Sequence, residues 1–426
     1  MILAVLVAMM ASATAQKTPE TSSLFEKFVD PGSGAVSYLL KPGTIAHNQQ
    51  SLYYTQKQMT DDGRFLVFVA EPSEADKDCF RRARLAVLDF LSDEVTVLDG
   101  FQGGTTLPYL DVREDVLLYL PLAKGEDGKG VYKVDLRGDL KKSVKLCDLP
   151  TAVTSLGKIK SYYTHFTRTS DGHGVYLDMQ LPKYPDRKGE AREIYSVHGV
   201  LDFTTGNFEE WYRNPYRVRH GAVNPVRPGV AMALEPYWET HRSVHDCAKD
   251  GVCRRLLLIR KGKEAELVVG RVPPGGKPPV HITHTEWTAD GRGIYWCSYD
   301  NGVILHDIDS GEETVLMKEN RAVHCEMSDD NRYIVFDASA CERRFRGQSW
   351  KVGFYDRVTK RTSWIYTRSP ELTTPDEPSK LHPDPHPNFA MNGRYAICTM
   401  NVKPGQLSVL VTPTAQFGAK EESSGR

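Results

Sequence analysis

Five of the thirteen histidines return to the same position of a degenerate internal repeat. Four of them stand six residues before the Asp or Asn of a polar turn, and one opens a similar segment. The five are His165, His220, His284, His324 and His386. A repeat that returns one residue type to one position gathers those side chains around a common axis. Imidazole titrates near neutral pH and is a frequent metal ligand, so the pattern suits acid–base chemistry or metal binding.

The polar turn is followed each time by a short apolar run. These turn-plus-strand units begin near residues 61, 113, 170, 226, 289, 329 and 391, roughly 40 to 65 residues apart. Short strands, Asp-Gly turns and a period near 50 are typical of a β-propeller. We therefore predict an all-β, seven-bladed propeller with four antiparallel strands in each blade, forming one domain over residues 16–418. Two β-sandwiches would explain the strand content but not the recurring turn.

The segment before each turn is the natural inner strand of a blade. A histidine six residues before the turn then lies at the start of that strand, about 20 Å from the turn. The five histidines are thus predicted to surround one mouth of the central channel. They could simply fill a wet channel, or they could form a carbohydrate pocket with histidine as general acid and base.

The local cluster His382-Pro-Asp384-Pro-His386 is a candidate metal site. Alternation in an extended segment places its two histidines and its aspartate on one face. Imidazole and carboxylate together suit a hard or borderline divalent ion such as Ca²⁺ or Mn²⁺.

Three further residues are candidates for binding sugar. Trp287 could stack on a sugar ring or could pack between blades, and Arg219 next to His220 could grip a uronic acid carboxylate. His165 is a candidate through its place in the repeat.

A polar run, His47-Asn48-Gln49-Gln50-Ser51, stands at the head of the first predicted inner strand. His47 lies nine residues before Gln56, the equivalent of the repeat histidines, and nine extended residues span up to about 30 Å. This spacing predicts that His47 belongs to the opposite face of the propeller. The alternative is a hydrogen-bonded loop that closes the ring between the first and last blades.

The motifs HITHTEW-TADG, HCEMSDDNRYIVFD and DPHPNF resemble the propeller oligogalacturonate lyases of polysaccharide lyase family 22. The resemblance implies His284 as the base and His324 and His386 as metal ligands. Asp384 stands where that family has a third ligating histidine, and Leu381 where it has a glutamine.

The N-terminal stretch, with HNQQSLYYT as its most specific part, is similar to glycoside hydrolase family 145 and to the related polysaccharide lyase family 42. Both act on L-rhamnose-α-1,4-D-glucuronate, the cap of arabinogalactan side chains. The resemblance implies His47 as the catalytic residue, Gln49 and Gln50 as sugar-binding neighbours, and hydrolysis with no metal requirement.

These resemblances lead to three expectations. The first is an α-L-rhamnosidase acting through His47 on a glucuronate-containing plant oligosaccharide or polysaccharide. The alternative is a β-eliminating lyase on rhamnose-glucuronate or oligogalacturonate that uses His220, His284 and Arg219. The third is a propeller that binds glycans without catalysis.

Composition limits the setting in which this chemistry would take place. The net charge of −1 gives no general attraction to nucleic acid or to anionic membranes. The apolar run 1–15 is predicted to be a signal peptide, which implies a periplasmic or secreted protein, and 419–426 is a polar tail. Cys247 and Cys253 are predicted to form a local disulfide, and a monomer is expected.

Overall fold

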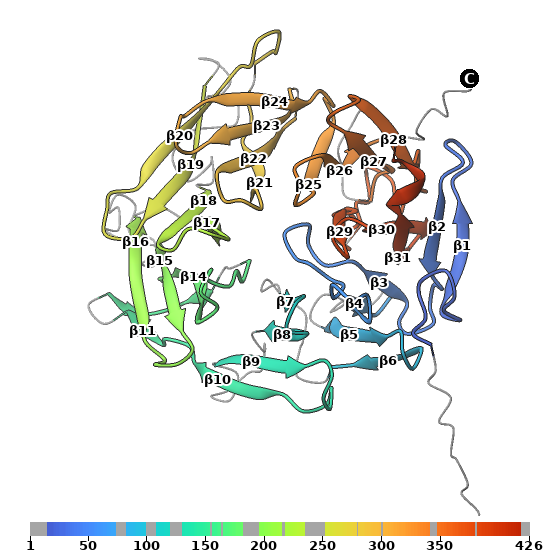
Figure 1. Cartoon of the computed structure of the whole chain (residues 1–426), viewed down its shortest axis with the longest axis horizontal. Helices are drawn as coiled ribbons and strands as arrows, with labels where there is room; N and C mark the ends of the chain where they lie inside the picture. Colours follow the sequence, from blue (N-terminus) through green and yellow to red (C-terminus); the bar gives the residue numbers. More distant parts are fainter. Residues whose placement is uncertain are drawn as a thin grey trace, which may run out of the picture.

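Seven antiparallel sheets stand around a central axis in the computed structural model (Figure 1). The structure describes residues 15–73, 82–98, 108–119, 130–153, 156–162, 165–181, 196–214, 218–234, 252–278, 280–299, 301–340, 347–379 and 381–418. The predicted all-β, seven-bladed propeller is confirmed. Within these residues, no helix is both long and apolar enough to cross a membrane.

In blades 1 to 6 the chain passes from the inner strand at the axis to the outer strand at the rim. Blade 1 contains β3 (Asn48–Gln50), β4 (Phe65–Glu71), β5 (Arg84–Asp89) and β6 (Glu94–Val97). Blade 2 contains β7 (Tyr109–Asp111), β8 (Val116–Tyr119), β9 (Gly130–Asp135) and β10 (Val144–Asp148). Blade 3 contains β13 (Ser161–Tyr162), β14 (Gly174–Gln180), β15 (Ser196–Asp202) and β16 (Phe208–Asn214). A small hairpin, β11 (Ala152–Val153) and β12 (Gly157–Lys158), precedes blade 3.

The second half of the ring repeats this order. Blade 4 contains β17 (Arg219–Val223), β18 (Val230–Leu234), β19 (Val252–Arg260) and β20 (Glu266–Arg271). Blade 5 contains β21 (Thr283–Trp287), β22 (Gly293–Ser298), β23 (Gly302–Asp307) and β24 (Glu313–Met317). Blade 6 contains β25 (Ala322–Met327), β26 (Tyr333–Ser339), β27 (Trp350–Asp356) and β28 (Arg361–Tyr366).

Blade 7 joins the two ends of the chain. It contains β29 (Asn388–Ala390), β30 (Tyr395–Lys403) and β31 (Gln406–Pro413), followed by β2 (Val36–Leu40) and β1 (Phe25–Val29) from the N-terminal side. A 3-10 turn, Thr414–Gln416, follows β31. Blade 7 therefore has five strands where four were predicted, because a β-hairpin near the N-terminus pairs with β31 and closes the ring.

All seven predicted turn-plus-strand units form the step from inner to second strand. In blade 3 the Thr169 hydroxyl donates to the Asp171 carboxylate and accepts the Gly174 amide, which fixes the turn. Thr288 and Asp290 repeat these contacts in blade 5. Thr60 with Asp62 in blade 1 and Ser328 with Asp330 in blade 6 make the same contacts, so a hydroxyl and a carboxylate fix this turn in four of the blades.

The second strands carry the core. All seven residues of β14 are buried, and Trp296 of β22 and Phe336 of β26 lie fully buried between blades. Because both faces of each blade pack on neighbours, these strands read as continuous apolar runs. The buried second strands thus support the inner strands, which face the axis.

Several predictions fall on other parts of the chain. Residues 1–14 of the predicted signal peptide, the tail 419–426 and Cys247 lie outside the described residues. The predicted Cys247–Cys253 disulfide therefore stays a prediction.

Candidate functional site

The structure brings the five repeat histidines together at the axis. The rings of His284 and His324 are 4.0 Å apart between centroids, and those of His324 and His386 are 4.4 Å apart. On the other side, His220 Nδ1 lies 2.7 Å from His165 Nε2. Residues from blades 3 to 7 thus meet in one polar cluster.

Local backbone distortions aim these side chains. The inner strand β17 has a β-bulge between Arg219 and Ala222, at His220. The inner strand β21 has one between Thr283 and Glu286, at His284. His220 has a φ of 57° and His284 a φ of 52°, in the left-handed region. Such a conformation is costly for a non-glycine residue, and bulges redirect side chains at functional sites.

A loop from blade 1 fills the space between the histidines. After β3 the chain leaves the sheet and extends toward the axis, as the blue segment before β4 shows in Figure 1. The Tyr53 ring lies 5.1 Å from His165 and 4.6 Å from His386. Tyr54 lies 5.2 Å from His324, and its hydroxyl donates to the Thr285 carbonyl over 3.2 Å. This loop closes the axis beneath the histidines.

His324, Asp384 and His386 form a group that could hold a metal ion. Each offers one ligand atom, and these atoms lie within 4.8 Å of one another. His386 Nε2 is buried and has no hydrogen-bond partner. A buried imidazole nitrogen without a partner, facing a second imidazole and a carboxylate, fits a divalent cation. His382 stacks on His386 at 5.0 Å but does not belong to the group.

The pKa values of these histidines differ because their neighbours differ. Burial lowers the pKa of His165 to about 4 and lowers the pKa of His386 well below its ordinary value. Burial is the largest single influence on His324 and opposes its protonation, but the carboxylates of Asp337 and Asp384 together outweigh it and raise the pKa of His324. The net direction therefore differs, because the carboxylate next to His165, Asp178, does not offset burial, whereas those next to His324 do.

His284 has the properties of a general base. Burial, followed by the nearby His324 and His220, holds the pKa of His284 well below its ordinary value. One side of its ring takes part in a hydrogen bond with the Val323 backbone, while Nδ1 is buried without a partner. A neutral imidazole held by its N–H and carrying an unused lone pair can accept a proton.

Arg255 is a site residue that the sequence interpretation missed. It lies in β19, donates to the Ile282 carbonyl over 2.8 Å, and its charge contributes to the lowered pKa of His284. Arg255 carries no repeat signature, because it reaches the site from the third strand of blade 4. Arg219, the arginine chosen from sequence, is half-buried at the start of β17 beside His220.

His47 does not lie where it was predicted. Asn48 pairs with Glu71 at the end of β4, just as Thr283 pairs with Cys297 near the end of β22. Inner strands β3 and β21 thus begin at the same end of the propeller, so His47 is not on the opposite face. It is exposed, and its Nε2 contacts the Gly405 carbonyl of blade 7 over 2.8 Å.

Gln49 and Gln50 are used inside the fold and not at a sugar site. The Gln49 amide nitrogen donates to the Lys41 carbonyl and to the Ser408 hydroxyl, and its oxygen accepts the Ile45 amide. Gln50 donates to the Glu71 carboxylate. The polar run closes the ring between blades 1 and 7, which was the alternative interpretation.

Trp287 is also not available to a sugar. Its indole is 5 % exposed and packs in the core between blades 4 and 5. The indole N–H donates to the Ala222 carbonyl over 3.1 Å. The prediction of a stacking ring is therefore wrong, and blade packing accounts for this tryptophan.

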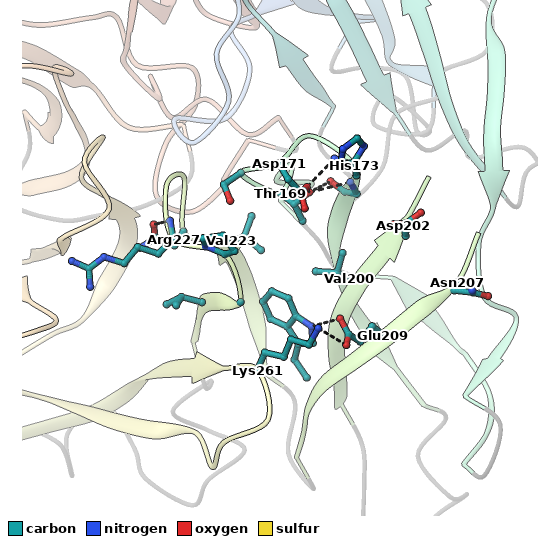
Figure 2. Close-up of a pocket in the computed structure, with 17 residues that line it drawn as sticks. Thr169, Asp171, His173, Val200, Asp202, Asn207, Glu209, Val223, Arg227 and Lys261 are labelled. Atoms are coloured by element: carbon teal, nitrogen blue, oxygen red, sulfur yellow. Dashed lines mark hydrogen bonds and ion pairs between the residues drawn. The ribbon is translucent and has the colours of Figure 1, made fainter. Parts of the chain in front are cut away.

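A separate hollow of about 460 Å³ lies between blades 3 and 4 (Figure 2). Figure 2 shows Asp171, Arg227 and Lys261 around it, and Asp171 belongs to the turn that leads into β14. Arg227 is paired with Asp309, and Lys261 is paired with Glu209. Since none of the clustered histidines lines this hollow, the acid–base candidates lie elsewhere.

Comparison with known proteins adds the following findings. No family model matches the chain, and no curated protein matches it. A solved structure of an oligogalacturonate lyase in complex with manganese is 18% identical to this chain, with a TM-score of 0.67. The match covers 91% of this chain and 96% of that lyase. An oligogalacturonate lyase from Vibrio parahaemolyticus is 16% identical, with a TM-score of 0.67, covering 92% and 96%. At these identities the likeness shows the propeller fold.

These neighbours correct the expectation of a glycoside hydrolase. The two solved structures described above are both named as oligogalacturonate lyases. The residue on which hydrolysis depended, His47, is an exposed side chain beside a hairpin turn and not a member of the buried cluster. The resemblance to oligogalacturonate lyases is matched by structure, while the resemblance to glycoside hydrolase family 145 and polysaccharide lyase family 42 is not.

Proposed function

We propose that the protein is a β-eliminating lyase acting on a uronate-containing oligosaccharide, with oligogalacturonate as the first substrate to test. The observation that carries the proposal is His284, a half-buried imidazole with a strongly lowered pKa, whose Nδ1 is buried and has no hydrogen-bond partner. Its ring lies 4.0 Å from that of His324, a member of the candidate metal group. A base beside a cation site is what removal of a proton next to a carboxylate requires.

The reaction would proceed as follows at this site. Nδ1 of His284 takes the C5 proton of the uronate, and the electron pair left at C5 forms the C4–C5 double bond. The C4–O4 bond breaks, and the departing oxygen is protonated from water. Negative charge accumulates on the uronate carboxylate during proton removal, so fixed positive charge nearby lowers the barrier.

Two sources of positive charge adjoin His284. Arg255 approaches from β19, and an arginine can hold a carboxylate through two parallel hydrogen bonds. His324, Asp384 and His386 would hold a divalent ion, which when bound neutralises charge on the carboxylate. One of the neighbouring lyases is described as a manganese complex, which supports Mn²⁺ as the ion to test.

The experiment follows ultraviolet absorbance of the new double bond. The purified protein is incubated with oligogalacturonate and, separately, with a rhamnose-capped glucuronide, each with Mn²⁺ and with a chelator. The proposal expects absorbance to rise with Mn²⁺ on at least one uronide and to stop with the chelator. Turnover that releases only saturated sugars would overturn it, and so would the absence of turnover.

His284→Asn is the matched variant for this experiment. Asparagine tolerates the left-handed backbone conformation of His284 but cannot act as a base at neutral pH. We expect it to remove the absorbance change while leaving Mn²⁺ binding intact.

A further inference from the structure

One buried carboxylate contacts two members of the candidate metal group at once. Asp337 Oδ1 accepts the His324 backbone amide over 2.8 Å, and Oδ2 lies 2.9 Å from His324 Nδ1. Oδ2 also accepts the His386 backbone amide over 3.2 Å. Asp337 itself is fully buried in β26. A single side chain of blade 6 therefore fixes groups in blades 6 and 7.

These contacts determine which nitrogen of His324 faces the metal group. A carboxylate accepts hydrogen bonds, so Nδ1 of His324 carries the proton that it donates to Asp337. The lone pair is then on Nε2, which is the form that a metal ligand needs. The same carboxylate holds the His386 backbone, and thereby orients its unpartnered Nε2.

The fold repeats this arrangement in blade 3, where the described residues form no comparable metal group. Asp178 is the fifth residue of β14, as Asp337 is the fifth residue of β26, and both are fully buried. Asp178 Oδ2 accepts the Gly221 amide of the next blade over 2.9 Å. Thr399 of β30 likewise accepts the Ser51 amide of blade 1. A polar group at this position thus anchors the neighbouring inner strand.

We propose that Asp337 is the positioning residue of the metal centre, holding His324 in its metal-binding tautomer and His386 in place across the blade boundary. The inference rests on the proposed function, because it assumes that His324, Asp384 and His386 bind a divalent ion. Asp178 anchors the inner strand of blade 4 and has no recorded contact with any of those three residues.

The test measures Mn²⁺ affinity by the electron paramagnetic resonance signal of free Mn²⁺, with no substrate present. Asp337→Asn keeps the size of the side chain but removes the second acceptor oxygen. We expect it to weaken Mn²⁺ binding by about 10- to 100-fold, the usual effect of losing a carboxylate behind a metal-bound histidine. Asp178→Asn is the matched control, with the same place in the repeat and the same burial. We expect it to leave Mn²⁺ affinity within about twofold of the wild type.

The outcomes separate the inference from the proposed function. If the wild type binds Mn²⁺ and Asp337→Asn binds it equally well while folded, the positioning role is wrong and the metal centre stands. Equal losses in the two variants would also overturn the role, since the effect would then belong to the fold. If the wild type does not bind Mn²⁺, the metal centre fails and the inference fails with it.

A measurement on the wild type alone covers the case in which Asp337→Asn does not fold. Long-range proton–nitrogen NMR spectra of ¹⁵N-histidine-labelled, metal-free protein report the tautomer of His324. The inference requires a protonated Nδ1. A protonated Nε2 with a bare Nδ1 would contradict it.

Discussion

Neighbouring histidines at the axis differ in pKa, although burial disfavours the charged form of each. Burial keeps His284 neutral, and a neutral ring is the form that can take a proton from a substrate. At His324 the neighbouring carboxylates, Asp337 first, oppose the effect of burial and raise the pKa. Two imidazoles whose centroids are 4.0 Å apart are thus prepared for different roles.

At this scale the first prediction concerns the base. His284→Asn should lower the elimination rate by about 10²- to 10⁴-fold, the usual contribution of a general base. His47→Asn is the control and should change the rate by less than about twofold, because His47 is exposed beside the blade 7 hairpin. The rates come from initial ultraviolet absorbance at saturating Mn²⁺. A large loss in His47→Asn with little loss in His284→Asn would contradict the assignment.

The second prediction concerns pH. Because the pKa of His284 is well below 6.5, its neutral form persists as pH falls through 6.5. The elimination rate at saturating Mn²⁺ and substrate should therefore stay level from about pH 8 to below pH 6.5, and decline only under more acidic conditions. A rate that halves near pH 6.5 would show an imidazole with an ordinary pKa and would exclude His284 as this buried base.

Among the strand elements, the bulges in the inner strands set the direction of the histidines. The bulge in β17 needs Gly221, since an added Cβ would come within 2.3 Å of Asp178 Oδ1 and 2.4 Å of Tyr176 Cε1. Asp178 accepts the Gly221 amide, so the glycine lets the strand approach the anchoring carboxylate. The place of His220 follows from this contact.

The third prediction tests that approach. Gly221→Ala should destabilise the protein by about 1–3 kcal/mol, the range for an overpacked site. Gly138→Ala is a fitting control, because the nearest atoms to its added Cβ lie 3.5 Å away. Denaturant unfolding gives the free energies. Equal stability of the two variants would mean that the bulge tolerates a Cβ.

The elements also show what sequence could predict. Seven polar turns predicted seven blades, and in blades 1, 3, 5 and 6 a hydroxyl–carboxylate pair fixes the turn. The face assigned to His47 was wrong because the count assumed a continuous strand from His47 to Gln56. The chain instead leaves the sheet after Gln50 and forms a loop at the axis. It rejoins the sheet at Met59, which forms a β-bridge with Leu66.

The tertiary site was predictable only in part. The five repeat histidines could be grouped from sequence because the repeat itself carries them to the axis. Arg255 and Asp337 could not, since both reach the site from strands behind the inner ones. Arg255 stands in no motif, and Asp337 ends the HCEMSDDNRYIVFD motif without any sign in the sequence that its carboxylate contacts His324 and His386. Trp287 and Gln49 looked like sugar-binding residues because sequence does not show that their polar groups are used inside the fold.

For the molecule as a whole, buried neutral histidines make the metal-free fold sensitive to acid. The pKa of His165 is lowered to about 4 in the folded protein, whereas an unfolded histidine titrates near 6.5. Between these values the unfolded chain binds the extra proton, so stability is full above pH 6.5 and is lost as pH falls.

The fourth prediction follows from this linkage. In His165→Asn, the unfolding free energy of the metal-free protein should fall less steeply with acid, by up to about 1.4 kcal/mol per pH unit between pH 6.5 and 4. Urea unfolding across this range, in wild type and variant, gives the two slopes. Identical slopes would show that His165 is not held neutral by burial.

The central claim is that this propeller cleaves a uronide by elimination and not by hydrolysis. The most direct test is to digest oligogalacturonate with the Mn²⁺-loaded protein in H₂¹⁸O and to record product masses. Elimination predicts an unsaturated product and a saturated product whose masses sum to that of the substrate, with no ¹⁸O fixed at the cleaved bond. Products that together contain one added water, labelled with ¹⁸O, would contradict the account.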